Sequence, residues 1–115
     1  MPKTMQSSER RSGNDRRTTT RYPVDIAIEW ETTGPRSTGS MSDVSFDGCF
    51  ILAAGEVTDG EPVRLFVPLA DGMKVQFSGR IANNVFEIGF GIKFDQLSVP
   101  QRDLLVSLVR AAENR

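Results

Sequence analysis

The sequence predicts an all-β domain with a terminal helix: a six-stranded antiparallel β-barrel followed by a C-terminal α-helix. Three observations favour this fold class. Apolar residues alternate with polar ones in short runs between residues 22 and 94, which is the period of a strand. Gly, Pro, Asp and Asn separate these runs at intervals too short for parallel crossover connections. The apolar period becomes helical only after residue 98.

The first half of the chain contains three predicted strands. The first has the clearest alternation, and its apolar face consists of Val24, Ile26, Ile28 and Trp30. Thr33-Gly34-Pro35 ends this strand. A weaker strand follows over about residues 38–44, and a short apolar strand spans residues 49–52. Closure of such strands into a barrel removes their exposed edges.

Three more strands follow in the second half. Alternation over residues 63–67 stops at Pro68, and Asp71-Gly72 fits a hairpin turn. The fifth strand carries Val75, Phe77 and Ile81, with Gly79 as a bulge or a site of close backbone approach. Asn83-Asn84 is predicted to turn the chain. The last strand has an apolar face of Ile88, Phe90, Ile92 and Phe94.

The C-terminal helix is predicted over about residues 98–113. Ser98 fits its N-cap, Pro100 lies in its first turn, and Gln101 completes a Ser-x-x-Gln capping box. The apolar stripe that follows has helical spacing and is expected to face the core; it consists of Leu104, Leu105, Leu108, Val109 and Ala112.

Charge divides the chain into two parts. Residues 1–21 contain six basic and two acidic residues, a net charge of +4, whereas the remainder carries −5. We expect a flexible basic N-terminal segment over residues 1–16 and a barrel domain over residues 17–115. A basic segment on an acidic body favours a local anionic ligand over a nucleic-acid groove, which would need a whole basic face.

Several function classes lack the residues they need. The chain has no histidine and one cysteine, Cys49, which is expected to be a small buried filler. We therefore expect no enzyme activity, no cofactor and no bound metal. No apolar run is long enough for a signal peptide or a membrane span, so the expected location is the cytoplasm, without direct membrane insertion.

Two short patterns carry most of the functional information. Residues 17–21 form an RxxxR pattern that enters the first strand, and residues 43–48 form a DxSxxG pattern that leaves the second. Composition alone predicts roughly one RxxxR but only about 0.06 DxSxxG, so the second pattern is the specific one. The arginines of the first, Arg17 and Arg21, provide forks that bind phosphate and stack on planar bases.

The DxSxxG pattern supplies complementary groups. Asp43 can accept hydrogen bonds from a ring N–H and an exocyclic amine, as on guanine, and the Ser45 hydroxyl can donate or accept. Gly48 is expected to allow positive φ or close backbone approach. A plain turn between two strands is the alternative reading of this pattern.

These residues resemble the ligand motifs of the PilZ domain family, and residues 87–94 are similar to its last strand. The resemblance covers about residues 9–115. It implies a six-stranded barrel with a C-terminal helix that binds the bacterial second messenger cyclic di-GMP. It also implies that Arg17 and Arg21 bind phosphates and stack on guanines, while Asp43 and Ser45 contact a guanine.

The arginine before the RxxxR extends this interpretation. Arg16 resembles an additional arginine in family members that bind an intercalated ligand pair, so we expect two cyclic di-GMP molecules per chain. Its alternative role is a solvated linker charge. We expect signalling by ordering of the N-terminal segment and a protein partner of unknown identity. The alternative function is a PilZ-shaped protein-interaction module that acts without cyclic di-GMP.

Two further side chains have alternative roles. Trp30 could stack on a base, but its place in the alternating face favours core packing. Arg80 is expected to be an exposed strand charge rather than a ligand contact.

Overall fold

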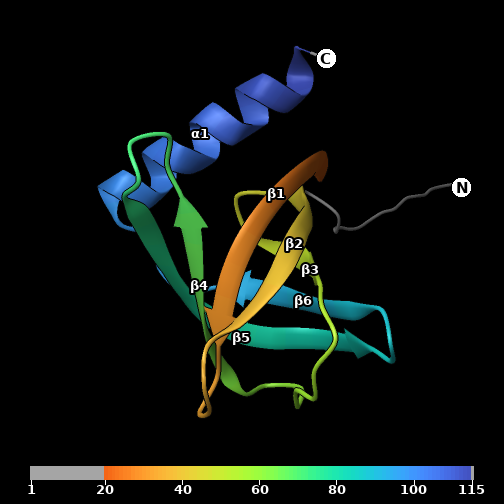
Figure 1. Cartoon of the computed structure of the whole chain (residues 1–115). Helices are drawn as coiled ribbons and strands as arrows, with labels where there is room; N and C mark the ends of the chain where they lie inside the picture. The colour runs from red at the N-terminus through yellow and green to blue at the C-terminus, as the bar shows by residue number, and fades with distance from the viewer. Residues whose placement is uncertain (1–19, 115) are drawn as a thin grey trace, which may run out of the picture.

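The computed structural model describes residues 20–114, which form a closed antiparallel barrel and one helix (Figure 1). The strands are β1 (Tyr22–Glu31), β2 (Ser37–Val44), β3 (Gly48–Leu52), β4 (Pro62–Pro68), β5 (Lys74–Val85) and β6 (Gly89–Phe94), followed by α1 (Val99–Glu113). The barrel order is β1-β2-β3-β6-β5-β4, and β4 pairs with β1 to close it. The predicted fold class is therefore confirmed. The segment 1–16 lies outside the described residues.

The barrel interior is filled by the alternating apolar faces predicted for the strands. Trp30 is 5% exposed and meets Phe90 edge to face, with 4.9 Å between ring centroids. Its indole N–H donates to the carbonyl of Thr38 at 3.2 Å, so the polar end of the ring is satisfied. The prediction that Trp30 packs in the core is confirmed. Cys49 is fully buried too, and burial raises the pKa of its thiol, which makes the thiol unreactive.

The predicted turn at Asn83-Asn84 is wrong. Both residues lie within β5, and the chain turns at residues 86–88 instead. A bulge between Ile81 and Asn83 lets the strand continue, and Gly91 leaves room beside the Asn83 side chain: a Cβ there would lie 2.4 Å from Asn83 Oδ1. Ile88 is consequently a turn residue and not part of the last strand's apolar face.

Gly79 marks a close approach of two strands and not a bulge. A Cβ at this position would lie 2.3 Å from the carbonyl oxygen of Lys93 on β6. The register of β5 with β4 is unbroken through Gly79. Of the two roles predicted for this glycine, close approach is confirmed and the bulge is wrong.

The helix begins and packs as its sequence predicts. The Ser98 hydroxyl accepts from the backbone N–H of Gln101, and the Gln101 side chain accepts from the N–H of Ser98 at 2.7 Å, which completes the capping box. Leu105 and Val109 are buried against the barrel. The Gln101 amide also donates to the carbonyl of Gln76 on β5 at 2.6 Å, fixing the first turn of α1 to the sheet. None of the helices in residues 20–114 is long and apolar enough to cross a membrane.

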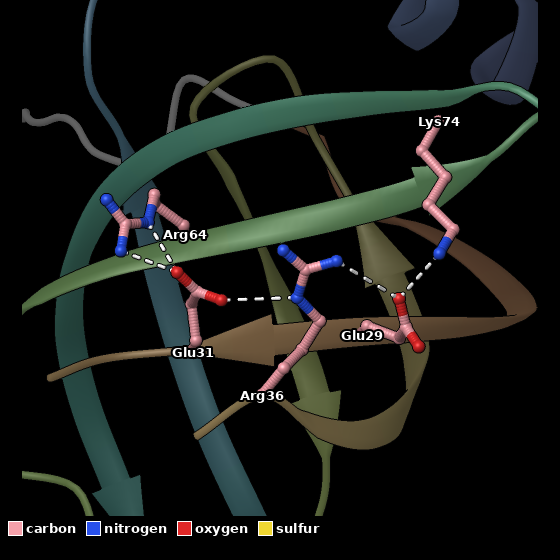
Figure 2. A network of polar contacts seen from close by, with 5 residues as sticks. All are labelled: Glu29, Glu31, Arg36, Arg64 and Lys74. Atoms are coloured by element: carbon pink, nitrogen blue, oxygen red, sulfur yellow. Dashed lines mark hydrogen bonds and ion pairs between the residues drawn. The ribbon is translucent and has the colours of Figure 1, made fainter. Parts of the chain in front are cut away.

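The β1–β4 pairing that closes the barrel is short, and we call it the seam. It contains only three residue pairs, from Glu29 to Glu31 on β1. A network of side chains reinforces it on the outer face: Arg36 lies between Glu29 and Glu31, Arg64 donates to Glu31 at 2.9 Å, and Lys74 donates to Glu29 at 2.8 Å (Figure 2).

Arg36 has a second contact at the seam. Its guanidinium carbon lies 3.8 Å from the centroid of the Phe66 ring, a cation–π arrangement. The hydrogen bond from Lys74 lowers the pKa of Glu29, and those from Arg36 and Arg64 lower the pKa of Glu31. Both carboxylates are thereby held in their charged form at the place where the barrel closes.

Candidate ligand-binding site

The structure brings the described parts of the two sequence patterns together. Arg21 directly precedes β1, and Tyr22 pairs with Val44 at the end of β2, inside the DxSxxG pattern. The Arg21 guanidinium donates to Asp43 Oδ1 at 2.6 Å, and both side chains reach solvent. Arg16 and Arg17 lie outside the described residues, so their predicted ligand contacts stay predictions.

Asp43 is positioned by irregular pairing on both sides of β2. It pairs with Pro23 on β1 and Phe50 on β3, and the register shifts beside it in both ladders. Such shifts bend the strand and redirect its side chains. The Asp43 carboxylate consequently reaches Arg21 at the outer face of the barrel.

Ser45 organises the turn that follows. It is 2% exposed, and its hydroxyl oxygen accepts from the backbone N–H groups of Asp47 and Gly48, both at 3.1 Å. The hydroxyl also donates to the Gly48 carbonyl at 3.2 Å. These bonds occupy the hydroxyl within the turn itself. The guanine contact predicted for Ser45 stays a prediction.

Gly48 is required by the close approach of β3 to β6. A Cβ at this position would lie 1.9 Å from the carbonyl oxygen of Ile92. Gly48 is not among the positive-φ residues, so of its two predicted roles close approach is confirmed and positive φ is wrong. The N–H of Phe94 donates to the Asp47 carbonyl at 2.7 Å and fastens the turn to the end of β6.

A cavity of about 220 Å³ lies beside this turn. Its wall contains small residues, which leave the strand backbone accessible, and two cations; the lining residues are Arg21, Asp47, Gly48, Ala82, Gly91, Ile92 and Lys93. Larger hollows of about 610 and 530 Å³ lie elsewhere and include none of the predicted site residues. The small cavity is the relevant one because Arg21 and the DxSxxG turn both reach it.

Lys93 lines the cavity and is a candidate site residue that the sequence analysis missed. It pairs with Gly48 across β3 and β6, and it lines the same cavity as Arg21. Its other neighbour, Arg80, turns away and donates to the Gly60 carbonyl at 2.9 Å, which confirms that Arg80 is an exposed strand charge. The sequence shows Lys93 as a lysine on the polar face of the last strand. That it lies opposite Gly48 follows only from the register between β3 and β6.

The arrangement suits an anion with hydrogen-bonding edges. Two cationic side chains and the backbone of a glycine-lined wall can bind phosphate oxygens, while Asp43 can accept from N–H donors. Within residues 20–114 no group of three or more His, Cys, Asp or Glu side chains is placed to hold a metal ion.

A family model described as "PilZ domain" matches residues 15–111. The chain belongs to the PilZ domain family. In this PilZ domain, Arg21 and the DxSxxG pattern lie at the end of the barrel where β1 and β3 begin. A comparison with curated proteins found no match.

Solved structures share the fold of this PilZ domain. The PilZ domain of CeSA from a cellulose-synthesizing bacterium is 22% identical, with a TM-score of 0.62 over 82% of this chain and 98% of the other. The PilZ domain of YcgR from Escherichia coli, solved with c-di-GMP, is 12% identical, with a TM-score of 0.68 over 86% and 92%. The inhibitor of motility MotI/DgrA of Bacillus subtilis is 17% identical, with a TM-score of 0.65; the match covers 87% of this chain and 53% of that protein.

Proposed function

We propose that this PilZ domain is a non-enzymatic receptor for cyclic di-GMP. Its ligand site comprises Arg16, Arg17, Arg21, Asp43, Ser45 and Gly48. The observation that carries the proposal is the meeting of Arg21 and Asp43, one from each motif, beside a cavity of about 220 Å³. The structurally similar domain of YcgR was solved with this ligand, which supports the choice of dinucleotide.

We expect ligand contacts to replace the ion pair between Arg21 and Asp43. An exposed ion pair of this kind contributes about 0.2–1 kcal/mol, whereas a hydrogen bond to a charged group contributes about 1.5–3 kcal/mol. The hydrogen bonds from Arg21 to a ligand phosphate and from a guanine to Asp43 would therefore contribute more free energy than the ion pair that they replace. Until then the pair holds the Asp43 carboxylate next to Arg21, which lines the cavity.

Signalling follows from the N-terminal arginines. Arg16, Arg17 and Arg21 close over the phosphates of two stacked ligand molecules and order the segment that precedes β1. Fixing each residue costs about 1–2 kcal/mol, and each charge-assisted hydrogen bond returns about 1.5–3 kcal/mol. These terms are similar in size, so ligand binding decides whether the segment is ordered.

Isothermal titration with cyclic di-GMP tests the proposal. We expect two ligands per chain for the wild type and one for Arg16→Ala. Arg17→Ala and Arg21→Ala should abolish detectable binding while the circular dichroism spectrum is unchanged. Arg102→Ala, on the exposed face of α1, is the matched control and should bind normally. Micromolar binding by an Arg17/Arg21 double variant would refute the site.

The alternative function is an interaction module that acts without the ligand. The observation that favours it is that Ser45 and Gly48 already have structural roles in the turn and in the β3–β6 approach. A flat titration trace with a folded wild-type protein would favour this alternative.

A further inference from the structure

The turn between β5 and β6 exposes several large apolar side chains. Phe86 is 82% exposed, Ile88 54%, Leu52 43% and Val85 37%. Single exposed apolar residues are ordinary, whereas a contiguous group of them marks an interaction site. We call these four residues the apolar tip.

The pairing pattern brings the four residues of the apolar tip to one end of the sheet. Leu52 and Val85 both pair with Gly89, one from each side, and the glycine has no side chain to separate them. The Ala53 N–H donates to the Ile88 carbonyl, and the Ile88 N–H donates to the Val85 carbonyl, so the turn is bonded to both neighbouring segments. Figure 1 shows this turn extending beyond the barrel, far from α1.

The turn also holds an unusual backbone conformation. Glu87 has φ of 65°, and among the described residues it is the only non-glycine residue with positive φ. A residue with a Cβ rarely adopts this region, and such outliers concentrate at functional positions. Glu87 lies between Phe86 and Ile88, which are the two most exposed residues of the apolar tip.

The charge around the apolar tip has one sign. A hollow of about 530 Å³ beside Phe86 is lined by Glu56 and Glu87. The residues that line this hollow include no lysine or arginine. An acidic rim around an apolar centre attracts a basic surface and repels anionic lipids, nucleic acids and a second acidic tip.

We propose that the apolar tip docks a protein segment that presents apolar side chains flanked by lysine or arginine. This surface is separate from the proposed ligand site. Gly48 pairs with Lys93 at the ligand end of the β3–β6 ladder, and Leu52 pairs with Gly89 at the other end, about 13 Å away by strand rise. The inference does not depend on cyclic di-GMP binding.

A peptide titration followed by backbone NMR tests the proposal. The probe is a synthetic amphipathic helix with leucine on one face and lysine on the other, and the comparison peptide carries glutamate in place of lysine. We expect the lysine peptide to shift the amides of residues 52–58 and 85–89. The glutamate peptide should bind at least tenfold more weakly. Equal binding of both peptides, or no shift at about 1 mM peptide, would overturn the proposal.

Substitutions distinguish specific binding at the apolar tip from non-specific binding by any exposed apolar side chain. Phe86→Ser should weaken binding of the lysine peptide at least tenfold. The matched control is Met73→Ser, because Met73 is 63% exposed in the other hairpin turn, between β4 and β5. An equal loss for both variants contradicts a specific docking surface. Both variants should keep the unfolding midpoint of the wild type, because both side chains are exposed.

Two further experiments with Phe86→Ser test whether the apolar tip binds a second copy of the chain or a membrane instead. Sedimentation that shows a dimer of the wild type but a monomer of Phe86→Ser would assign the apolar tip to a second copy and overturn the proposal. Co-sedimentation with phosphatidylglycerol vesicles, lost in Phe86→Ser, would assign it to a membrane and overturn it too. The proposal is supported if the wild type is a monomer, does not co-sediment with vesicles and binds the lysine peptide through residues 85–89.

Discussion

The Arg21 guanidinium donates a 2.6 Å hydrogen bond to the Asp43 carboxylate, across 22 residues of sequence. The bond joins the start of β1 to the end of β2, where Tyr22 pairs with Val44. One residue of each sequence pattern therefore meets a residue of the other through the barrel's own strand pairing. The proposed ligand site therefore depends on the register between β1 and β2.

Asp43→Ala should abolish measurable cyclic di-GMP binding with little change in stability. The side chain lies at the surface, and its ion pair with Arg21 is worth about 0.2–1 kcal/mol. Titration calorimetry measures the first effect and urea denaturation the second. A variant that binds with wild-type affinity would show that Asp43 does not contact the ligand. Asp103→Ala, on the exposed side of α1, is the control.

Lys93→Ala should weaken cyclic di-GMP binding by about tenfold, because it removes one charge-assisted contact from the cavity. Lys74→Ala is the matched control, since Lys74 lies at the seam network and away from the cavity. Titrations of both variants provide the comparison. Equal affinities would place Lys93 outside the site while leaving the roles of Arg21 and Asp43 unaffected.

Gly48→Ala should destabilise the barrel by roughly 1–3 kcal/mol, because the new Cβ would press on the Ile92 carbonyl and force β3 away from β6. Gly34→Ala is the control, since no heavy atom lies within 4 Å of a Cβ built there. Urea denaturation of the two variants measures the difference. Equal unfolding free energies would contradict the close approach.

Ser45→Ala should cost roughly 1–3 kcal/mol of unfolding free energy, because it leaves the buried N–H of Gly48 and the partly buried N–H of Asp47 without the hydroxyl acceptor. Ser107→Ala, at an exposed helical position, should change stability by less than about 0.5 kcal/mol. Thermal and urea unfolding provide the measurement. A Ser45→Ala protein as stable as the wild type would show that water or relaxation satisfies these groups.

Barrel stability should fall as the medium is acidified. Glu29 and Glu31 have pKa values in the folded protein below the ordinary 4.5, so their contribution is complete above that value. It is lost as the pH falls through the lowered folded pKa values. A Glu29→Gln/Glu31→Gln variant should show a flatter decline below pH 4.5 than the wild type in urea denaturation. Glu113→Gln, at the end of α1, should leave the slope unchanged.

Much of the fold could be predicted because local rules and tertiary packing agree. The alternation around Trp30 matches its burial, and the Ser98–Gln101 capping box starts the helix where expected. The turn at Asn83-Asn84 was mispredicted because turn-forming residues were assigned without the bulge at Ala82 or the space at Gly91. Those features depend on a neighbouring strand and leave no local pattern.

The candidate site was predictable to a smaller extent. The spacing of the motifs pointed to Arg21 and Asp43 but did not show that they bond to each other. Lys93 could not be predicted as a candidate site residue, because its position opposite Gly48 depends on the pairing of β3 with β6, which spans 45 residues of sequence. The structural work of Ser45 was equally hidden, because a hydroxyl in a turn can face either its own backbone or a ligand.

The two roles within the DxSxxG turn affect how such motifs are compared between homologues. Ser45 and Gly48 maintain the turn and the strand contact, so a homologue that does not bind nucleotide would still be selected to keep them. Within the described residues, the side chains of Arg21 and Asp43 reach solvent and bond only to each other among the contacts that join the two patterns, so they can change once nucleotide binding is not selected. We therefore expect homologues that do not bind cyclic di-GMP to have lost the residues corresponding to Arg21 and Asp43 and to have kept those corresponding to Ser45 and Gly48.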